Sequence, residues 1–161
     1  MTPAQFWAQK STRPEYLTVT FEHPEMGEPI RLVADQFAPV TINGNEYTPA
    51  PMSITPPEQT SDPIARLRVG FPRAVVGREF KRRLKQISIG GRLSPISVTY
   101  AHWLGSDLSA PVSSWSLYVD RDAGIVFGPE TVQVTATDDN PLRLNCSEIY
   151  DPAEWTGLLQ V

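Results

Sequence analysis

The residues best suited to do chemistry in this 161-residue sequence are cationic side chains crowded into one short stretch. They are Arg73, Arg78, Lys81, Arg82, Arg83 and Lys85. At this density, guanidinium and ammonium groups can neutralise the phosphates of a nucleic acid or bind the carboxylates of another protein. They can also form nothing more than a solvated face. Three interpretations therefore compete: a nucleic-acid contact, a subunit contact and a solvated surface.

The distribution of charge along the chain favours the subunit contact. Positions 66–92 hold nine basic residues and one acid, Glu79, for a net charge of +8; the whole chain carries −4, which leaves −12 for the remainder. Identical subunits with such a charge split can attract one another in a ring or a stack. The six cations are therefore predicted to form a subunit interface. The acidic pI of about 5.2 argues against direct DNA binding.

Other residue types form no recognisable reactive pattern. His23 and His102 are far apart and lack the spacing of a metal pair, so each is expected to be a packing or surface residue. Asp120 and Asp122 resemble the start of a calcium loop, but Thr131 occupies the position that requires a bidentate Glu, so a turn is expected instead. We expect no catalytic, metal-binding or cofactor-binding residues, and no enzymatic activity.

Three aromatic residues, Trp103, Trp115 and Tyr118, lie in expected strands. Such rings can form a platform on which sugars stack, although packing into a core is the commoner use of aromatic residues in strands. The sequence is compatible with both interpretations.

The elements that must position these residues are mostly strands. Sixteen prolines and ten glycines punctuate a chain that is 40 % apolar, which favours short strands joined by turns. The expected fold is mainly β, a β-sandwich or split barrel with one flanking basic α-helix and a short N-terminal helix. The length fits one domain over residues 1–161.

Cysteine content and hydropathy place further limits on this domain. Cys146 is the single cysteine, so no disulfide can form within the chain. No signal peptide or membrane-length apolar run is present, so membrane insertion is not expected.

Local patterns locate the individual elements. Alternating apolar residues predict strands over 16–22, 29–34, 40–42, 46–48, 52–54, 64–69, 96–104, 115–120, 124–127, 131–137 and 142–146. The first two should pair antiparallel, and Asn43-Gly44-Asn45 should form a tight hairpin turn. A short helix is expected over Pro3–Lys10. The main helix is expected over Arg73–Gln86, because one helical face of this segment is apolar. That face consists of Val76, Phe80, Leu84 and Ile87.

Four segments carry a resemblance to a known group of proteins. Pro14–Pro24, Pro29–Val33, Asn43–Pro49 and Ala65–Val69 resemble, in this order, an uncharacterised-domain family encoded in phage and prophage tail operons. A strand ending in His-Pro, an Asn-Gly hairpin followed by Tyr-Thr, and an Ala-Arg-Leu-Arg strand leading to a helix recur in that family. These residues are framework positions and indicate no reaction.

The resemblance implies a structural role in a virus particle. It implies a minor tail protein of the distal tail or baseplate-hub type, which forms a ring that joins the tail tube to the tip complex. The implied partners are further copies of the chain, with a hexamer favoured and a trimer as the alternative, and neighbouring tail-tube, hub and tip proteins. The implied location is the virion tail tip, after synthesis in the host bacterial cytoplasm.

Other functions stay open beside this one. The main alternative is a binding module of the tail tip for a cell-surface glycan or for DNA in the tube lumen. A tail-associated cell-wall hydrolase is a third hypothesis, for which the sequence supplies no catalytic group. If the helix forms a subunit interface, reversing the charges of Arg82 and Arg83 should weaken assembly more than folding of the monomer.

Overall fold

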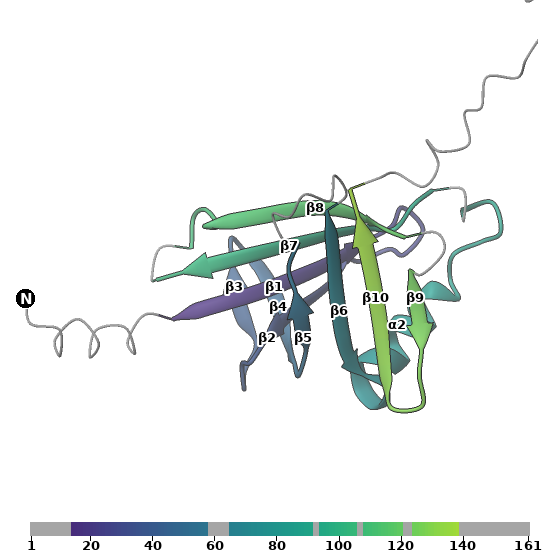
Figure 1. The fold of residues 1–161 in the computed structure, drawn as a ribbon, viewed down its shortest axis with the longest axis horizontal. Coiled ribbons are helices and arrows are strands. Elements are labelled where there is room, and N and C mark those ends of the chain that lie inside the picture. The colour runs from purple at the N-terminus through teal and green to yellow at the C-terminus, as the bar shows by residue number, and fades with distance from the viewer. Residues whose placement is uncertain (1–13, 58–64, 92–93, 106–107, 121–123, 139–161) are drawn as a thin grey trace, which may run out of the picture.

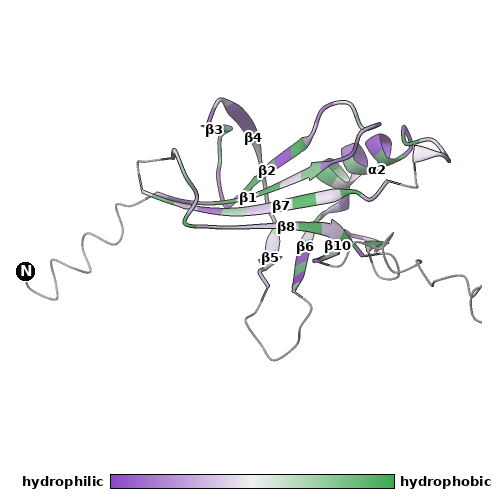
Figure 2. Cartoon of the chain, turned by 90° about the horizontal axis from the view of Figure 1, so that it is seen from above, coloured by the Kyte–Doolittle hydropathy of each residue, from purple (hydrophilic) through white to green (hydrophobic). Residues whose placement is uncertain are grey.

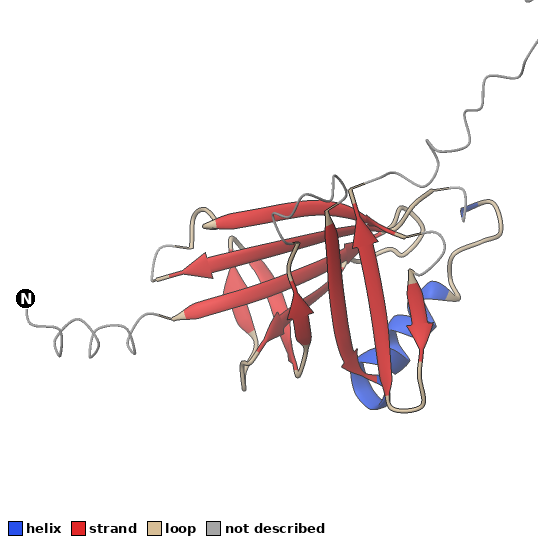
Figure 3. Ribbon diagram, viewed as in Figure 1, coloured by secondary structure: helices blue, strands red, loops and turns tan. Residues whose placement is uncertain are grey.

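The computed structural model describes residues 14–57, 65–91, 94–105, 108–120 and 124–138. Strands dominate these residues, and one helical segment flanks them (Figure 3). The mainly β prediction with a flanking helix is therefore confirmed. The helix predicted over Pro3–Lys10 and the strand predicted over Leu142–Cys146 lie outside the described residues.

The strands follow the alternating patterns closely. They are β1 (Glu15–Glu22), β2 (Ile30–Ala34), β3 (Val40–Ile42), β4 (Asn45–Ala50), β5 (Ser53–Thr55), β6 (Arg66–Pro72), β7 (Ser97–Leu104), β8 (Ser113–Val119), β9 (Ile125–Phe127) and β10 (Thr131–Thr137). The predicted antiparallel pairing of β1 with β2 is confirmed. The hairpin turn is confirmed as well: Asn43 and Gly44 have φ values of 49° and 75°, the positive values that a two-residue turn of this kind requires.

The described strands form one open mixed sheet with the order β3-β4-β2-β1-β7-β8-β10-β6-β5, and β9 pairs with β10 beside it (Figure 1). Neighbours are antiparallel except β2 and β4, which run parallel. β3 and β5 are the two ends of this strand order. The expected β-sandwich or split barrel is not confirmed by this arrangement.

The sheet curls strongly around its main core. β1 and β6 are four interstrand steps apart, which would separate them by about 19 Å in a flat sheet. Nevertheless, the ring centroids of Phe21 on β1 and Phe71 on β6 lie only 6.3 Å apart. Figure 1 shows the cause, because β1, β7 and β8 run across the view while β6 and β10 run nearly down it. The concave side of this curl encloses the core.

One aromatic ring from the helix fills that concave side. Phe80 is fully buried, and its ring packs edge-on against Phe21 at 5.0 Å and against Phe71 at 5.4 Å. Val76, Leu84 and Ile87 pack on the same cluster, so the predicted apolar face of the helix is confirmed. Three mutually edge-on rings at these distances contribute packing energy beyond their buried area.

The helical segment begins differently from the prediction. Residues predicted as one α-helix, Arg73–Gln86, form a π-helical turn η1 (Arg73–Gly77) followed by the α-helix α2 (Arg78–Leu84). The preceding strand also continues to Pro72, beyond the predicted end at Val69. The wider π-helical turn occurs where the chain passes over β10, with Gly77 at the point of contact. The spacing of the apolar residues does not predict such a turn.

A second, smaller core lies on the opposite face of the sheet. Val33, Ile42, Tyr47, Ala101 and Trp103 are buried there. The indole Nε1–H of Trp103 donates a hydrogen bond to Thr18 Oγ1 at 3.0 Å, and that hydroxyl donates to the carbonyl oxygen of Ala101 at 3.2 Å. This core holds the β3–β4 hairpin against β1, β2 and β7.

The Phe80 contacts predict the consequence of removing the ring. Phe80→Ala should lower the free energy of unfolding by about 3–5 kcal/mol, because it leaves a cavity where the helix meets the curled sheet. Val75→Ala, at an exposed position of η1, should change it by less than about 0.5 kcal/mol. Urea denaturation of both variants measures the difference. Equal effects would contradict the anchoring role of Phe80.

Candidate functional site: a basic pocket beside the helix

Backbone and side-chain contacts tie the start of the helical segment to the β9–β10 turn. The backbone N–H of Arg73 donates to the carbonyl oxygen of Glu130 at 2.8 Å, and its Nη1 donates to the carbonyl oxygen of Gly128 at 3.2 Å. The turn is closed by a hydrogen bond from the N–H of Gly128 to the carbonyl oxygen of Thr131. Two elements far apart in sequence thus form one unit.

Gly77 brings the helical segment close to the sheet. A Cβ atom at this position would lie 2.8 Å from Val132 Cγ2 and 3.2 Å from the carbonyl oxygen of Pro72. Val132 is fully buried, so it has little freedom to move aside. The φ of Gly77 is −64°, an ordinary helical value, so the glycine is needed for space and not for backbone conformation.

A surface pocket of about 610 Å³ lies between these two elements. It is lined by Arg73, Ala74, Gly77, Arg78, Lys81, Phe127, Pro129 and Glu130. Three cations thus surround an opening with an apolar wall, and Glu130 supplies one acid. The Nζ atom of Lys81 lies 5.7 Å from the centroid of the Phe127 ring, a distance at which cation and ring attract. Such a pocket suits a ligand that combines negative charge with an apolar group.

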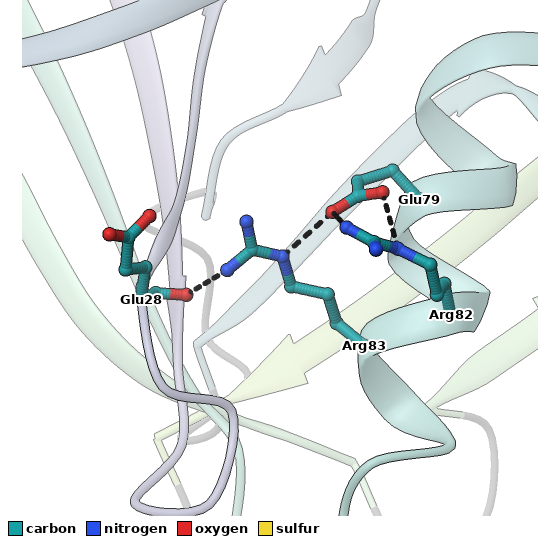
Figure 4. Close-up of polar contacts among 4 residues, drawn as sticks. All are labelled: Glu28, Glu79, Arg82 and Arg83. Atoms are coloured by element: carbon teal, nitrogen blue, oxygen red, sulfur yellow. Dashed lines mark hydrogen bonds and ion pairs between the residues drawn. The ribbon is translucent and has the colours of Figure 1, made fainter.

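Two other cations of the helix, Arg82 and Arg83, make contacts within the subunit. Arg82 donates from Nε and Nη2 to the two carboxylate oxygens of Glu79, at 2.8 and 2.6 Å. Arg83 donates to Glu79 at 2.9 Å and to the carbonyl oxygen of Glu28, in the β1–β2 turn, at 2.6 Å (Figure 4). Arg83 therefore joins the helix to the β1–β2 connection. These contacts lower the pKa of Glu79 from 4.5 to about 2, chiefly through the hydrogen bonds from Arg82.

The structure divides the six predicted interface residues into groups. Arg73, Arg78 and Lys81 meet at the pocket, whereas Arg82 and Arg83 bind Glu79. Lys85 is exposed just past the last helical turn and does not line the pocket. The interface itself stays a prediction. Sequence reasoning missed Phe127, Pro129 and Glu130, which lie some 50 residues further along the chain and carry no local signal of this contact.

Both histidines occupy structural positions. His23 is buried, and its Nδ1 accepts the backbone N–H of Glu25 at 3.1 Å. Its Nε2–H can therefore donate to the carbonyl oxygens of Gly91 and Ser94, at 3.0 and 3.2 Å. His102 is half-buried on β7, with Nε2 2.8 Å from Glu15 Oε1. His23 thus packs in the interior of the protein, and His102 lies at the partly exposed face of β7.

Among the residues that the structure describes, no three His, Cys, Asp or Glu side chains gather as a metal ion would require. No helix in that part of the chain has the length and hydropathy needed to cross a bilayer.

The aromatic residues considered as a sugar platform do not lie together. Trp103 is 6 % exposed in the smaller core, whereas Trp115 packs against the main core on the other face of the sheet. A stacking surface shared by these two rings is therefore absent.

The Glu79 contacts generate a pH-dependent prediction. A carboxyl group whose pKa is lowered on folding stabilises the protein above its unfolded pKa, near 4.5, and loses this effect as the pH falls toward 2. Glu79→Gln should thus lower the free energy of unfolding at pH 6 by up to about 1 kcal/mol, a modest value because the side chain is 41 % exposed.

Denaturation curves between pH 6 and pH 2.5 test this expectation. The difference between Glu79→Gln and the wild type should shrink as the pH falls. The exposed Glu46→Gln variant, which alters a carboxylate on β4 away from the helix, serves as the control. A difference that stays constant across the range would contradict the ion-pair assignment.

Comparison with known proteins gives a family but no activity. The family model of DUF1833, a domain of unknown function, matches residues 4–140 and so includes the curled sheet, the helix and the pocket. No protein with a curated description matches the chain. The chain therefore belongs to the DUF1833 family.

Proposed function

We propose that the chain is a structural subunit of a tailed-bacteriophage tail tip, a distal tail or baseplate-hub protein that forms a ring between the tail tube and the tip complex. The favoured ring is a hexamer, with a trimer as the alternative. The proposal starts from the resemblance of four segments to proteins of phage tail operons. The observation that carries it further is the basic pocket, which presents three cations and an apolar wall on a chain that is acidic elsewhere.

The segments that carry the resemblance serve as framework in this structure. His23 of the His-Pro pair locks the β1–β2 turn to residues 91 and 94. Asn43 and Gly44 form the hairpin turn between β3 and β4. Residues 66–69 lie in β6 and lead to the helical segment. A framework of this kind supports a rigid wall, which is what a ring subunit requires.

The curled sheet gives that wall its shape. Its concave side is filled by the Phe80 cluster, while one edge of the helix turns its cations outward. In Figure 2 hydrophilic colour dominates the ribbon of α2. As part of the proposal, the sheet corresponds to the β-sandwich or split barrel expected for such tail proteins, with the helix at the contact between subunits.

A phosphate-binding role for the same pocket is the second candidate, because Arg73, Arg78 and Lys81 could contact the backbone of DNA in the tube lumen. Nucleic-acid binding of this kind weakens steeply with salt, since it depends on the release of counterions. A titration of the purified chain with duplex DNA at two salt concentrations separates the two functions. The glycan alternative loses the joint Trp103–Trp115 platform on which it depended.

Location in the virus particle is the first expectation to test. Antibodies against the chain, applied to purified virions of the phage or prophage that encodes it, should place gold label at the distal end of the tail. Antibodies against a major capsid protein provide the control. If the chain is found only in lysates and not on purified virions, the proposal is wrong.

Assembly should respond to charge at the pocket. The pair Arg82 and Arg83 is a poor choice for charge reversal, because both residues bind Glu79 within the subunit and reversal would disturb the fold. The double variant Arg78→Glu/Lys81→Glu alters exposed side chains. It should weaken self-association at least about tenfold, a loss of about 1.4 kcal/mol.

The measurement is sedimentation of both forms at equal concentration. Arg66→Glu reverses one exposed charge on β6, away from the pocket, and should leave association close to that of the wild type. Thermal unfolding of each variant should stay within a few degrees of the wild type. Unchanged association of the double variant would remove the pocket from the interface.

A further inference from the structure

Phe37 is the most exposed large apolar side chain in the described part of the protein, at 105 % of the reference exposure for phenylalanine. It lies in the short loop between β2 and β3, which consists of residues 35–39. Phenylalanine left entirely in water at a loop tip costs solvation free energy that burial against a partner would recover. The loop therefore has the character of an unoccupied anchor.

The loop holds this anchor in a defined place. Val33 before it and Ile42 after it are both buried in the smaller core. Asp35 turns the chain at the end of β2 with a φ of 54°, a value that Asn and Asp adopt more readily than most other residues with a side chain. Pro39 restricts the other end of the loop. Because five residues join two anchored strands, little conformational entropy is lost when the loop binds.

The chemistry of the loop complements that of the basic pocket. From position 35 to position 57 the sequence contains two acids, Asp35 and Glu46, and no Lys or Arg. The pocket presents Arg73, Arg78 and Lys81 beside the partly exposed ring of Phe127. The loop thus offers an exposed aromatic ring two residues from a carboxylate, and the pocket offers the complementary apolar wall surrounded by cations. The volume of the pocket, about 610 Å³, is large enough for a group bigger than one side chain.

The loop and the pocket lie toward opposite ends of the subunit. Arg83 binds the carbonyl oxygen of Glu28, which places the start of β2 beside the helix. The loop follows the other end of β2, five residues and about 16 Å away. The loop leads into β3. In both Figure 1 and Figure 2, β3 and α2 lie toward opposite ends of the sheet. A contact between such surfaces joins two copies head to tail, and repetition of it closes a ring when the rotation allows.

We propose that the loop of residues 35–39 of one subunit inserts Phe37 into the basic pocket of the next, with Asp35 among the pocket cations. The contact rests on the proposed self-assembly and specifies which surfaces make it. It is heterologous, so each subunit uses a different face for each of its two neighbours.

Two variants test the contact from its two sides. Phe37→Ser removes the anchor and leaves the pocket intact, whereas Arg78→Glu/Lys81→Glu alters the pocket and leaves the loop intact. Sedimentation equilibrium should show self-association weakened at least about 30-fold by Phe37→Ser, as expected for an aromatic anchor at the centre of an interface. Ile89→Ser, which removes another exposed apolar side chain, should associate as the wild type does.

Mixing the two variants distinguishes this contact from every symmetric one. At a protein concentration at which the wild type only just assembles, each variant alone should be monomeric, because its self-association is at least about tenfold weaker. An equimolar mixture should form a one-to-one dimer and nothing larger, because one intact loop meets one intact pocket while the two other surfaces are blocked. A mixture that stays monomeric would overturn the proposal. Wild-type protein that remains monomeric up to about 1 mM would overturn it as well.

Two further outcomes separate this contact from the proposed function. A Phe37→Ser chain that assembles normally and is still found at the virion tail tip would leave the tail role standing and remove only the loop. Salt-sensitive DNA binding that is lost in Arg78→Glu/Lys81→Glu, without any change in self-association, would assign the pocket to phosphate instead.

Discussion

The packing of the Phe80 ring between Phe21 and Phe71 is the interaction on which the rest of this structure depends. The rings of Phe80, Phe21 and Phe71 come from α2, β1 and β6. The strands β1 and β6 are four steps apart in the strand order, and their rings meet because the sheet curls. The same contact fixes how the helix is rotated about its axis. When Phe80 points into the core, the basic residues on the other faces of the same helix must point toward solvent. A hydrophobic requirement therefore determines where the charge of this protein is presented.

The cations thus exposed are not equivalent. Glu79, the single acid between positions 66 and 92, binds Arg82 and Arg83, and Arg83 also holds the β1–β2 turn. Arg73, Arg78 and Lys81 lie on another part of the segment, beside the β9–β10 turn. Part of the positive charge is paired within the subunit, and part lines the surface pocket beside the helix. Gly77 makes the second group possible, because a side chain there would push the segment away from Val132.

The sequence predicts local structure well wherever one period or one turn dictates it. Alternation located the strands, Asn43-Gly44 located a hairpin, and the spacing of Phe80 and Leu84 located the helix. Long-range relations were beyond such patterns: the parallel β2–β4 pair, the curl of the sheet and the approach of Phe127 to Lys81 all depend on tertiary packing. The ion pairs of Glu79 did carry a signal, since Arg82 and Arg83 follow it by three and four residues, the spacing at which helical side chains meet.

The proposed interface between subunits can be observed directly in the assembled particle. A residue-resolution image of the intact tail tip, by electron cryomicroscopy, tests it within the assembled particle. The proposed contact predicts copies of this chain repeated around the tail axis, each with its basic pocket covered by the residue 35–39 loop of the next copy. A tip without this chain, or a ring in which the pocket of every copy faces open solvent, would contradict it.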